Sequence, residues 1–243
     1  MTEQEWLACT DPEPMLEFVR GKVSDRKLRL LACACCRRIW HLPDSKESSH
    51  HAVETAERYA DGLVGEEDIR QAEQAAWDAW YPDEAPPLDQ MGFIATAAFA
   101  LTTGRSFQHT RPTGAIIQRV TWEYIRDSVQ NVLWVAGREE EEGRFEPERD
   151  RRFRHEVADL MRCVFGNPFR SVTHRPEVLA WNGGTVVKLA HAIYEERGFE
   201  RLAILADALE EAGCDNADLL SHCREAADHT RGCWAIDRIL GKE

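Results

Sequence analysis

Hydrophobic positions recur along most of this chain at spacings of three and four residues, which is the period of an amphipathic α-helix. The clearest case is the segment 28–42, where Arg29, Arg37 and Arg38 fall on the polar faces. Its apolar stripe consists of Leu28, Leu31, Cys35, Ile39 and Leu42. Ser24 is a suitable N-cap for this helix, and Pro43 follows its end.

The same period predicts helices along the rest of the chain. They lie at 53–63, 69–80, 116–133, 147–165, 186–194, 202–209, 219–223 and 234–240. The Ala-rich run 91–101 is nearly all apolar, which favours a buried central helix. No segment has the alternation typical of a strand, and no fixed-period repeat is evident. We therefore expect an all-α protein, an irregular multi-helix bundle of about ten short helices.

One internal boundary is indicated by a charged loop that contains four consecutive glutamates, Glu139–Glu142, followed by Gly143. It divides the chain into an N-terminal helical region (1–137), an acidic loop (138–146) and a C-terminal helical region (147–243). With 243 residues, 43% of them hydrophobic, the chain can bury a core either as two such regions or as one continuous domain.

Charge and hydropathy exclude several classes of partner. The net charge is −13, from 30 basic and 43 acidic residues, and no basic patch is segregated, so we expect no nucleic-acid partner. The start of the chain, Met1–Trp6, has neither the basic region nor the apolar run of a secretory signal. No apolar run approaches the ~18 residues of a membrane span. These features predict a soluble, cytoplasmic protein without a membrane partner.

The chain contains eight cysteines, which we expect to be reduced thiols in a cytoplasmic protein. Cys33, Cys35 and Cys36 fall inside the best-defined predicted helix, where packing between helices accounts for them. An alternative is that Cys33 and Cys36 offer thiolates to an ion shared with His41 or with the Cys and His residues near the C-terminus.

Thiols and imidazoles also gather at the C-terminal end of the chain. Five candidate metal ligands fall there, namely Cys214, His222, Cys223, His229 and Cys233. No two of them form the C-x2-C pair typical of zinc knuckles, yet a structural zinc site needs only four converging N or S donors. The competing interpretation is that the cysteines fill the core, since free cysteine is among the most buried residue types. No cofactor is therefore predicted, with zinc as the open alternative.

Signals for catalysis are weak, and we predict no catalytic residues. His191 and Glu195 lie one helical turn apart, but such pairs are common on solvated helix faces. His155 offers a second imidazole next to Glu156. The segment Asn182-Gly-Gly-Thr185 precedes a helix and can bind an anion or provide a Thr N-cap, but it lacks the lysine of a phosphate loop.

Eight tryptophans are an unusual number for a chain of this length, and most of them are expected in the core. Trp77, Trp80 and Tyr81 lie beside a proline-rich segment and are the interface candidates, because exposed aromatic clusters mark protein contacts.

Several segments resemble a bacterial family that has no assigned activity and occurs as many paralogues in some large-genome bacteria. The segments that carry this resemblance are 5–12, 26–40, 165–169, 205–214, 222–224 and 231–234. The resemblance implies no cofactor or catalytic residue, and it implies a recognition or accessory role. We thus expect a non-enzymatic module that binds an unknown protein partner; the alternatives are a small metalloprotein with a structural zinc, and a hydrolase.

Overall fold

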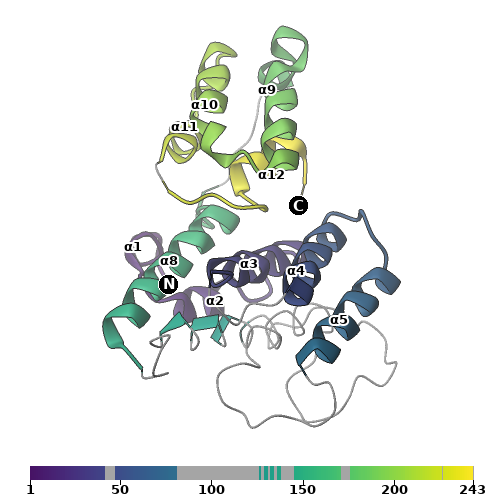
Figure 1. Cartoon of the computed structure of the whole chain (residues 1–243). Coiled ribbons are helices and arrows are strands. Elements are labelled where there is room, and N and C mark those ends of the chain that lie inside the picture. The colour runs from purple at the N-terminus through teal and green to yellow at the C-terminus, as the bar shows by residue number, and fades with distance from the viewer. Residues whose placement is uncertain are drawn as a thin grey trace. The chain divides into compact units, whose positions relative to one another are not determined.

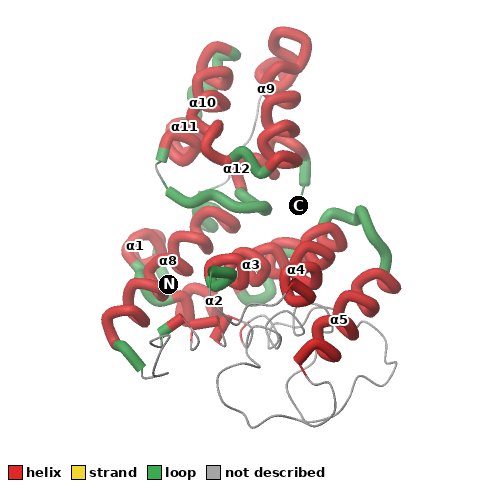
Figure 2. Tube along the Cα trace, viewed as in Figure 1, coloured by secondary structure: helices red, strands yellow, loops and turns green. Residues whose placement is uncertain are grey.

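The computed structural model describes residues 1–41, 47–80, 126, 129–130, 132–133, 136–137, 145–170, 176–225 and 227–242, without the side chains of Trp77 and Trp80. Within these ranges the chain forms ten α-helices, one 3-10 helix and no strand (Figures 1 and 2). The prediction of an all-α fold with about ten helices is confirmed.

The described residues form two compact units. The first, called the terminal unit, consists of Met1–Cys9 and Ala158–Glu243, and the second, called the central unit, is Thr10–Val157. The division falls inside the long helix α8 (Pro147–Phe165). The acidic loop at 138–146 lies mostly outside the described residues.

The central unit contains three consecutive helices, namely α3 (Asp25–Arg38), α4 (Glu47–Ala60) and α5 (Glu66–Trp80). They follow α2 (Pro12–Val19) in the chain. Helix α4 packs against both α3 and α5 (Figure 1). The Ser24 hydroxyl caps α3 by accepting a hydrogen bond of 3.3 Å from the Lys27 amide, as predicted.

The three thiols of α3 are core residues. Cys33, Cys35 and Cys36 are all fully buried. Burial raises the pKa of Cys35 to about 12 and holds the pKa of Cys36 well above its ordinary value, because an apolar environment disfavours the thiolate. Within the described residues, these cysteines belong to no group of converging metal ligands, and their geometry agrees with the packing interpretation.

A buried ion pair joins α3 to α4. Arg37 donates two hydrogen bonds of 2.8 Å to the two carboxylate oxygens of Glu57, whose side chain is 2% exposed. The same guanidinium lies 4.1 Å from the centre of the Trp40 ring. Two parallel charge-assisted bonds fix the orientation of one helix relative to the other.

The terminal unit is built from α1 (Glu3–Ala8), the end of α8, α9 (Pro176–Glu196), α10 (Leu202–Glu211), α11 (Ala217–Arg224) and α12 (Trp234–Leu240), with a 3-10 turn at Phe199–Arg201. Helices α10 and α12 both pack against α9, and α11 packs against α10 (Figure 1). Helix α9 is kinked where Asn182, Gly183 and Gly184 all have positive φ, at the position where the sequence indicated a break.

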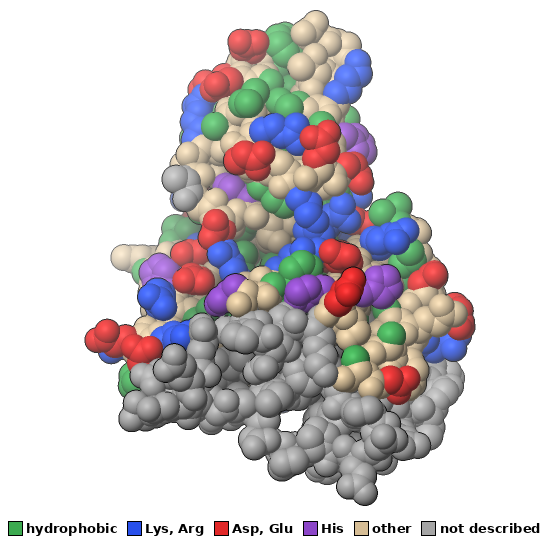
Figure 3. Space-filling view, viewed as in Figure 1, with side chains coloured by type: hydrophobic (Ala, Val, Ile, Leu, Met, Phe, Trp, Pro, Cys, Tyr) green, Lys and Arg blue, Asp and Glu red, His purple; other side chains and the backbone are tan. Residues whose placement is uncertain are grey.

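Some sequence predictions fall outside the described residues. They are the helix at 91–101, most of the helix at 116–133, Tyr81, and the side chains of Trp77 and Trp80. In the part of the chain that is described, no helix is both long and apolar enough to cross a bilayer. On the face shown in Figure 3, acidic and basic side chains are interspersed.

The Arg37–Glu57 pair yields a first prediction. Arg37→Ala removes the bidentate partner of a buried carboxylate and should lower the free energy of unfolding by about 3 kcal/mol. The double variant Arg37→Met/Glu57→Leu should recover most of this loss, because no charge is then left buried. Urea denaturation followed by circular dichroism measures both changes. Arg20→Ala, which breaks the exposed pair with Glu17, is the control and should cost less than about 1 kcal/mol. An equal loss in Arg37→Ala and Arg20→Ala would contradict the role of the buried pair.

Candidate metal centre

Two thiols and two imidazoles converge in the terminal unit. Cys163, His222, His229 and Cys233 place one ligand atom each so that all four atoms lie within 4.8 Å of one another. They come from the end of α8, from α11, from the loop after α11, and from the residue that precedes α12. Among the described residues this is the only such group of metal-ligating side chains.

Cys163 is positioned by the way α8 ends. Gly166 terminates the helix with φ +68°, and its carbonyl accepts a 3.2 Å hydrogen bond from the indole of the buried Trp6. A Cβ atom at Gly166 would lie 3.0 Å from the ring of Trp234, so the close approach of this ring requires glycine. The last turn of α8 is thereby held between α1 and the start of α12.

His222 and Cys233 are positioned by helix ends. The Asn216 side chain caps α11 by accepting a 2.9 Å hydrogen bond from the Leu219 amide, and His222 follows in the last turn of this helix. Cys233 is the residue before α12, and its amide donates a 2.9 Å hydrogen bond to the Thr230 carbonyl. His229 precedes Cys233 by four residues, within the same loop.

Two of the observed distances match the edge between an N and an S ligand in a tetrahedron around one ion. The Nε2 atom of His222 lies 3.3 Å from the sulfur of Cys233, and the Nδ1 atom of His229 lies 3.6 Å from the sulfur of Cys163. A tetrahedral zinc ion with N ligands at about 2.0–2.1 Å and S ligands at about 2.3 Å separates an N and an S ligand by about 3.5 Å. The two imidazole rings meet edge to face, with centroids 4.8 Å apart and an interplanar angle of 89°, so they do not compete for space.

The outer nitrogens of both imidazoles face a single residue, Glu225. Its carboxylate lies 3.7 Å from Nδ1 of His222, and its backbone carbonyl lies 3.4 Å from Nε2 of His229. In metal sites, the ring nitrogen that does not bind the ion commonly donates to a carboxylate or carbonyl, which fixes the tautomer and the ring orientation. The Glu225 carbonyl is within hydrogen-bond distance of His229 and its carboxylate is at ion-pair distance from His222, and both contacts leave the inner nitrogen of each ring available as a ligand.

The electrostatics of the cluster favour a thiolate at its centre. Burial by itself would raise the pKa of the Cys233 thiol, but hydrogen bonds from Cys163, His222 and His229 hold this pKa well below its ordinary value. For His229, burial lowers the pKa, while the bond and the charge of Cys233 outweigh it and leave the pKa raised. A metal ion bound by this cluster requires two thiolates and two neutral imidazoles, and the low pKa of Cys233 favours the first of these thiolates.

The site is enclosed by protein. Cys233 is fully buried, Cys163 is 3% exposed and His222 is 9% exposed, while His229 is partly exposed. Four protein ligands complete a tetrahedral sphere, whereas catalytic zinc sites use three protein ligands and leave one position for water or substrate. The geometry therefore suits a structural ion.

Three of the five residues singled out in the sequence, His222, His229 and Cys233, belong to this cluster. Cys223 does not, because consecutive residues of a helix point in different directions. It lies in the hydrophobic core, 1% exposed, and its pKa is raised, chiefly by burial. Cys214 is also outside the cluster; it is partly exposed and follows Gly213, which has φ +81° after α10.

Cys163 is the member of the cluster that sequence reasoning missed. It occupies an apolar position of α8 and is far from the other candidates in the sequence, so no local spacing marks it. The available signal was the pair His229-x3-Cys233, which places an imidazole and a thiol four residues apart. A tetrahedral site then needs two further donors from other parts of the chain.

The remaining sequence candidates do not form a site within the described residues. His191 and Glu195 are exposed on α9, and His155 is exposed on α8. Thr185 donates a 2.9 Å hydrogen bond from its hydroxyl to the Asn182 carbonyl inside the kink. These positions agree with solvated helix faces and local turn chemistry.

Comparison with known proteins adds no family to this picture. No family model matches the chain, and the searches of curated proteins and of solved structures found no significant similarity.

The position of Glu225 leads to a second prediction. Glu225→Ala should weaken zinc binding about tenfold, because the carboxylate no longer orients His222, while the backbone carbonyl still holds His229. Competition with a chromophoric zinc chelator measures the affinity. Glu211→Ala removes an exposed carboxylate at the end of α10 and should leave the affinity unchanged. Equal affinities of wild type and Glu225→Ala would mean that the carboxylate does not support the ligand.

Proposed function

We propose that this protein is a zinc-stabilised helical module in which Cys163, His222, His229 and Cys233 hold one structural ion. The observation that carries the proposal is the convergence of four ligand atoms within 4.8 Å, from three different parts of the fold. The outer contacts of both imidazoles with Glu225 support it, because they orient the rings so that the other nitrogen of each faces a thiol.

Zinc is the ion that suits this set of ligands. Two thiolates and two imidazoles in tetrahedral positions are typical of structural zinc. A two-iron cluster with two cysteines and two histidines binds the cysteines to one iron and the histidines to the other, with the cluster between the pairs. Here each cysteine lies next to a histidine, and the spacing of the four atoms suits a single ion.

The proposed ion stabilises a segment that has little regular structure of its own. Between the end of α11 at Arg224 and the start of α12 at Trp234, the described residues form no helix. Both His229 and Cys233 lie in this loop, and the other two ligands lie on α8 and α11. Zinc binding would join the loop to both helices, and in small metal domains such binding contributes directly to folding.

A structural ion with four protein ligands favours a role in binding over a role in catalysis, because it leaves no open position for a substrate. We infer a protein partner from the acidic composition, and a cytoplasmic location from the eight cysteines, none of which forms a disulfide. The resemblance to the bacterial family of many paralogues is part of the same proposal, since paralogous modules suit recognition. The hydrolase alternative has no support among the described residues, where His191 and His155 are exposed on helix surfaces.

Metal analysis of wild-type and variant protein provides the main test and a third prediction. Protein purified without added metal should carry about one zinc per chain. Cys163→Ala/His229→Ala should lose most of this zinc, because two of the four ligands are removed. Cys214→Ala is the matched control, since it removes a thiol of the same unit that lies outside the cluster, and it should retain the full amount.

Two further measurements separate metal loss from unfolding. Cys223→Ala should retain zinc while lowering the free energy of unfolding by about 1 kcal/mol, because it removes a buried sulfur from the core. Substitution of Co²⁺ into the wild type should give the intense visible absorption of a tetrahedral ion with thiolate ligands. A wild-type protein with neither bound zinc nor this spectrum would refute the metal site.

Acid should release the metal, which is a fourth prediction. Because protons compete with zinc for thiolates and imidazoles, the retained zinc should fall steeply below about pH 6. The sign follows from His229, whose raised pKa in the metal-free cluster favours protonation as the pH falls. A zinc-sensitive dye measures the release, and removal of zinc by a chelator at neutral pH should lower the unfolding midpoint by about 10 °C. Zinc retained unchanged down to about pH 4 would contradict this prediction.

A further inference from the structure

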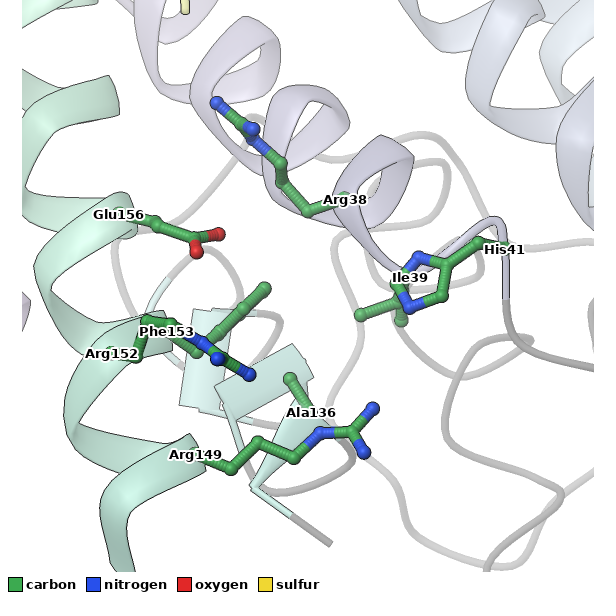
Figure 4. Close-up of a pocket in the computed structure, with 8 residues that line it drawn as sticks. All are labelled: Arg38, Ile39, His41, Ala136, Arg149, Arg152, Phe153 and Glu156. Atoms are coloured by element: carbon green, nitrogen blue, oxygen red, sulfur yellow. The ribbon is translucent and has the colours of Figure 1, made fainter. Parts of the chain in front are cut away.

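The central unit has a cavity that shares no residue with the metal centre. It lies between the C-terminal end of α3 and the first turns of α8 (Figure 4). The described residues of its lining belong to the Thr10–Val157 unit, and they include Arg38, Arg149 and Arg152. No cysteine contributes to this lining, so the cavity takes no part in the chemistry of the thiols.

Two of the four ligand atoms in the metal centre are sulfurs that can react with each other. The Sγ atoms of Cys163 and Cys233 lie within 4.8 Å of each other, and a hydrogen bond joins the two side chains. A disulfide has an S–S bond of about 2.05 Å. The two sulfurs are already neighbours, so their oxidation to a disulfide requires no third thiol.

Three further cysteines of the terminal unit lie outside the cluster. Cys9 follows α1, Cys214 follows α10, and Cys223 lies in the hydrophobic core. None of these three belongs to the group of converging ligands. An oxidant that reaches the cluster therefore meets one preferred pair of thiols.

The positions of the four ligands in the chain decide what a disulfide would keep and what it would release. Cys163 is in the last turn of α8, and Cys233 directly precedes α12. A bond between their sulfurs would keep the end of α8 joined to the start of α12. His222 on α11 and His229 in the loop would instead lose the ion that joins them to this pair.

The solvent reaches this cluster most closely through the loop that contains His229. Both sulfurs are buried, whereas His229 is partly exposed and the preceding residues Ala227 and Asp228 are exposed. A loop without helical hydrogen bonds opens locally at a lower cost than a packed helix. The buried position of the sulfurs favours a small oxidant over a bulky one.

We propose that the metal centre is also a redox-sensitive site, at which a peroxide oxidises Cys163 and Cys233 to a disulfide and the zinc ion is released. This inference rests on the proposed zinc site. Zinc itself does not change its oxidation state, so both electrons come from the sulfurs. The outcome is a terminal unit in which α8 and α12 stay linked while α11 and the loop are less restrained.

The atoms and electrons of this reaction balance with hydrogen peroxide as the oxidant. One thiolate attacks a peroxide oxygen, the O–O bond breaks, hydroxide leaves, and the sulfur becomes a sulfenic acid. The second thiolate attacks this sulfur and expels another hydroxide as the S–S bond forms. Two electrons pass from the sulfurs to the peroxide, and two protons from the solvent convert the hydroxides to water. The ion has then lost both thiolate ligands and keeps only two imidazoles.

Oxidation of the full-length, zinc-loaded protein tests this proposal. Hydrogen peroxide is added in the presence of a zinc-sensitive dye, and the disulfides are then mapped by mass spectrometry of peptides prepared without reductant. The expected result is a Cys163–Cys233 disulfide, with one zinc released for each disulfide formed. Dithiothreitol and added zinc should then restore the bound ion. Zinc release without this disulfide, or this disulfide with zinc retained, would overturn the proposal.

The zinc content before oxidation tests the proposed function separately. A wild-type protein that binds no zinc refutes the metal site and this inference with it. A zinc-loaded protein that shows no Cys163–Cys233 disulfide after peroxide treatment refutes the redox inference alone. Cys214→Ala is the matched control, since it removes a thiol outside the cluster, and it should release zinc at the same rate as the wild type. Loss of the release in Cys214→Ala would assign the oxidation to another pair and contradict the proposal.

Hydrogen exchange measures whether the link between α8 and α12 is kept. In the oxidised protein, the amides of residues 227–232 should exchange about tenfold faster than in the zinc-loaded protein, because His229 is no longer held. The amides of α12 should exchange more slowly in the oxidised protein than in reduced, zinc-free protein, because the disulfide still joins this helix to α8. Equal exchange of α12 in these two forms would contradict the retained link.

Discussion

The most demanding feature of the terminal unit is the group of two thiols and two imidazoles that meet beside its hydrophobic core. Side chains of this kind are costly to bury unless each donor and acceptor has a partner. Here the sulfur of Cys233 receives its partners from His222, His229 and Cys163, and Glu225 serves the outer nitrogens of both rings. Contacts among the four side chains and contacts of the two rings with Glu225 therefore both orient the cluster. This is the organisation expected around a metal ion.

Two further features of the terminal unit position the members of this cluster, namely the end of α8 and the loop between α11 and α12. Cys163 reaches the cluster because α8 stops at Gly166, where a positive φ and the ring of Trp234 leave no space for a side chain. The loop between α11 and α12 contributes two of the four ligands, although its own backbone forms no helix. A single ion would thus replace the hydrogen bonds that regular structure provides elsewhere.

The central unit uses sulfur and charge in a different way. Its three thiols on α3 are fully buried, and the raised pKa values of Cys35 and Cys36 make them inert packing groups. Its polar chemistry depends on arginine instead. Arg37 links α3 to α4 through Glu57, while Arg38, the next residue, belongs to the lining of the cavity. Adjacent arginines on one helix thereby differ in role, because helical rotation sends one toward α4 and the other toward the cavity.

The sequence by itself determined the helical period of most of the described helices and several of their ends, although it predicted neither α1 nor α2. Period, caps and stops are local, so Ser24, Gly166 and the break at Asn182–Gly184 were readable from their neighbours. The concentration of Cys and His near the C-terminus was visible for the same reason. Tertiary structure alone decided the membership of the cluster. It added Cys163 from a distant helix and left Cys223 in the core, because the direction of a side chain on a packed helix depends on contacts that no local spacing records. It also brought Arg38 to the same cavity as Arg149 and Arg152, from which it is far away in the sequence.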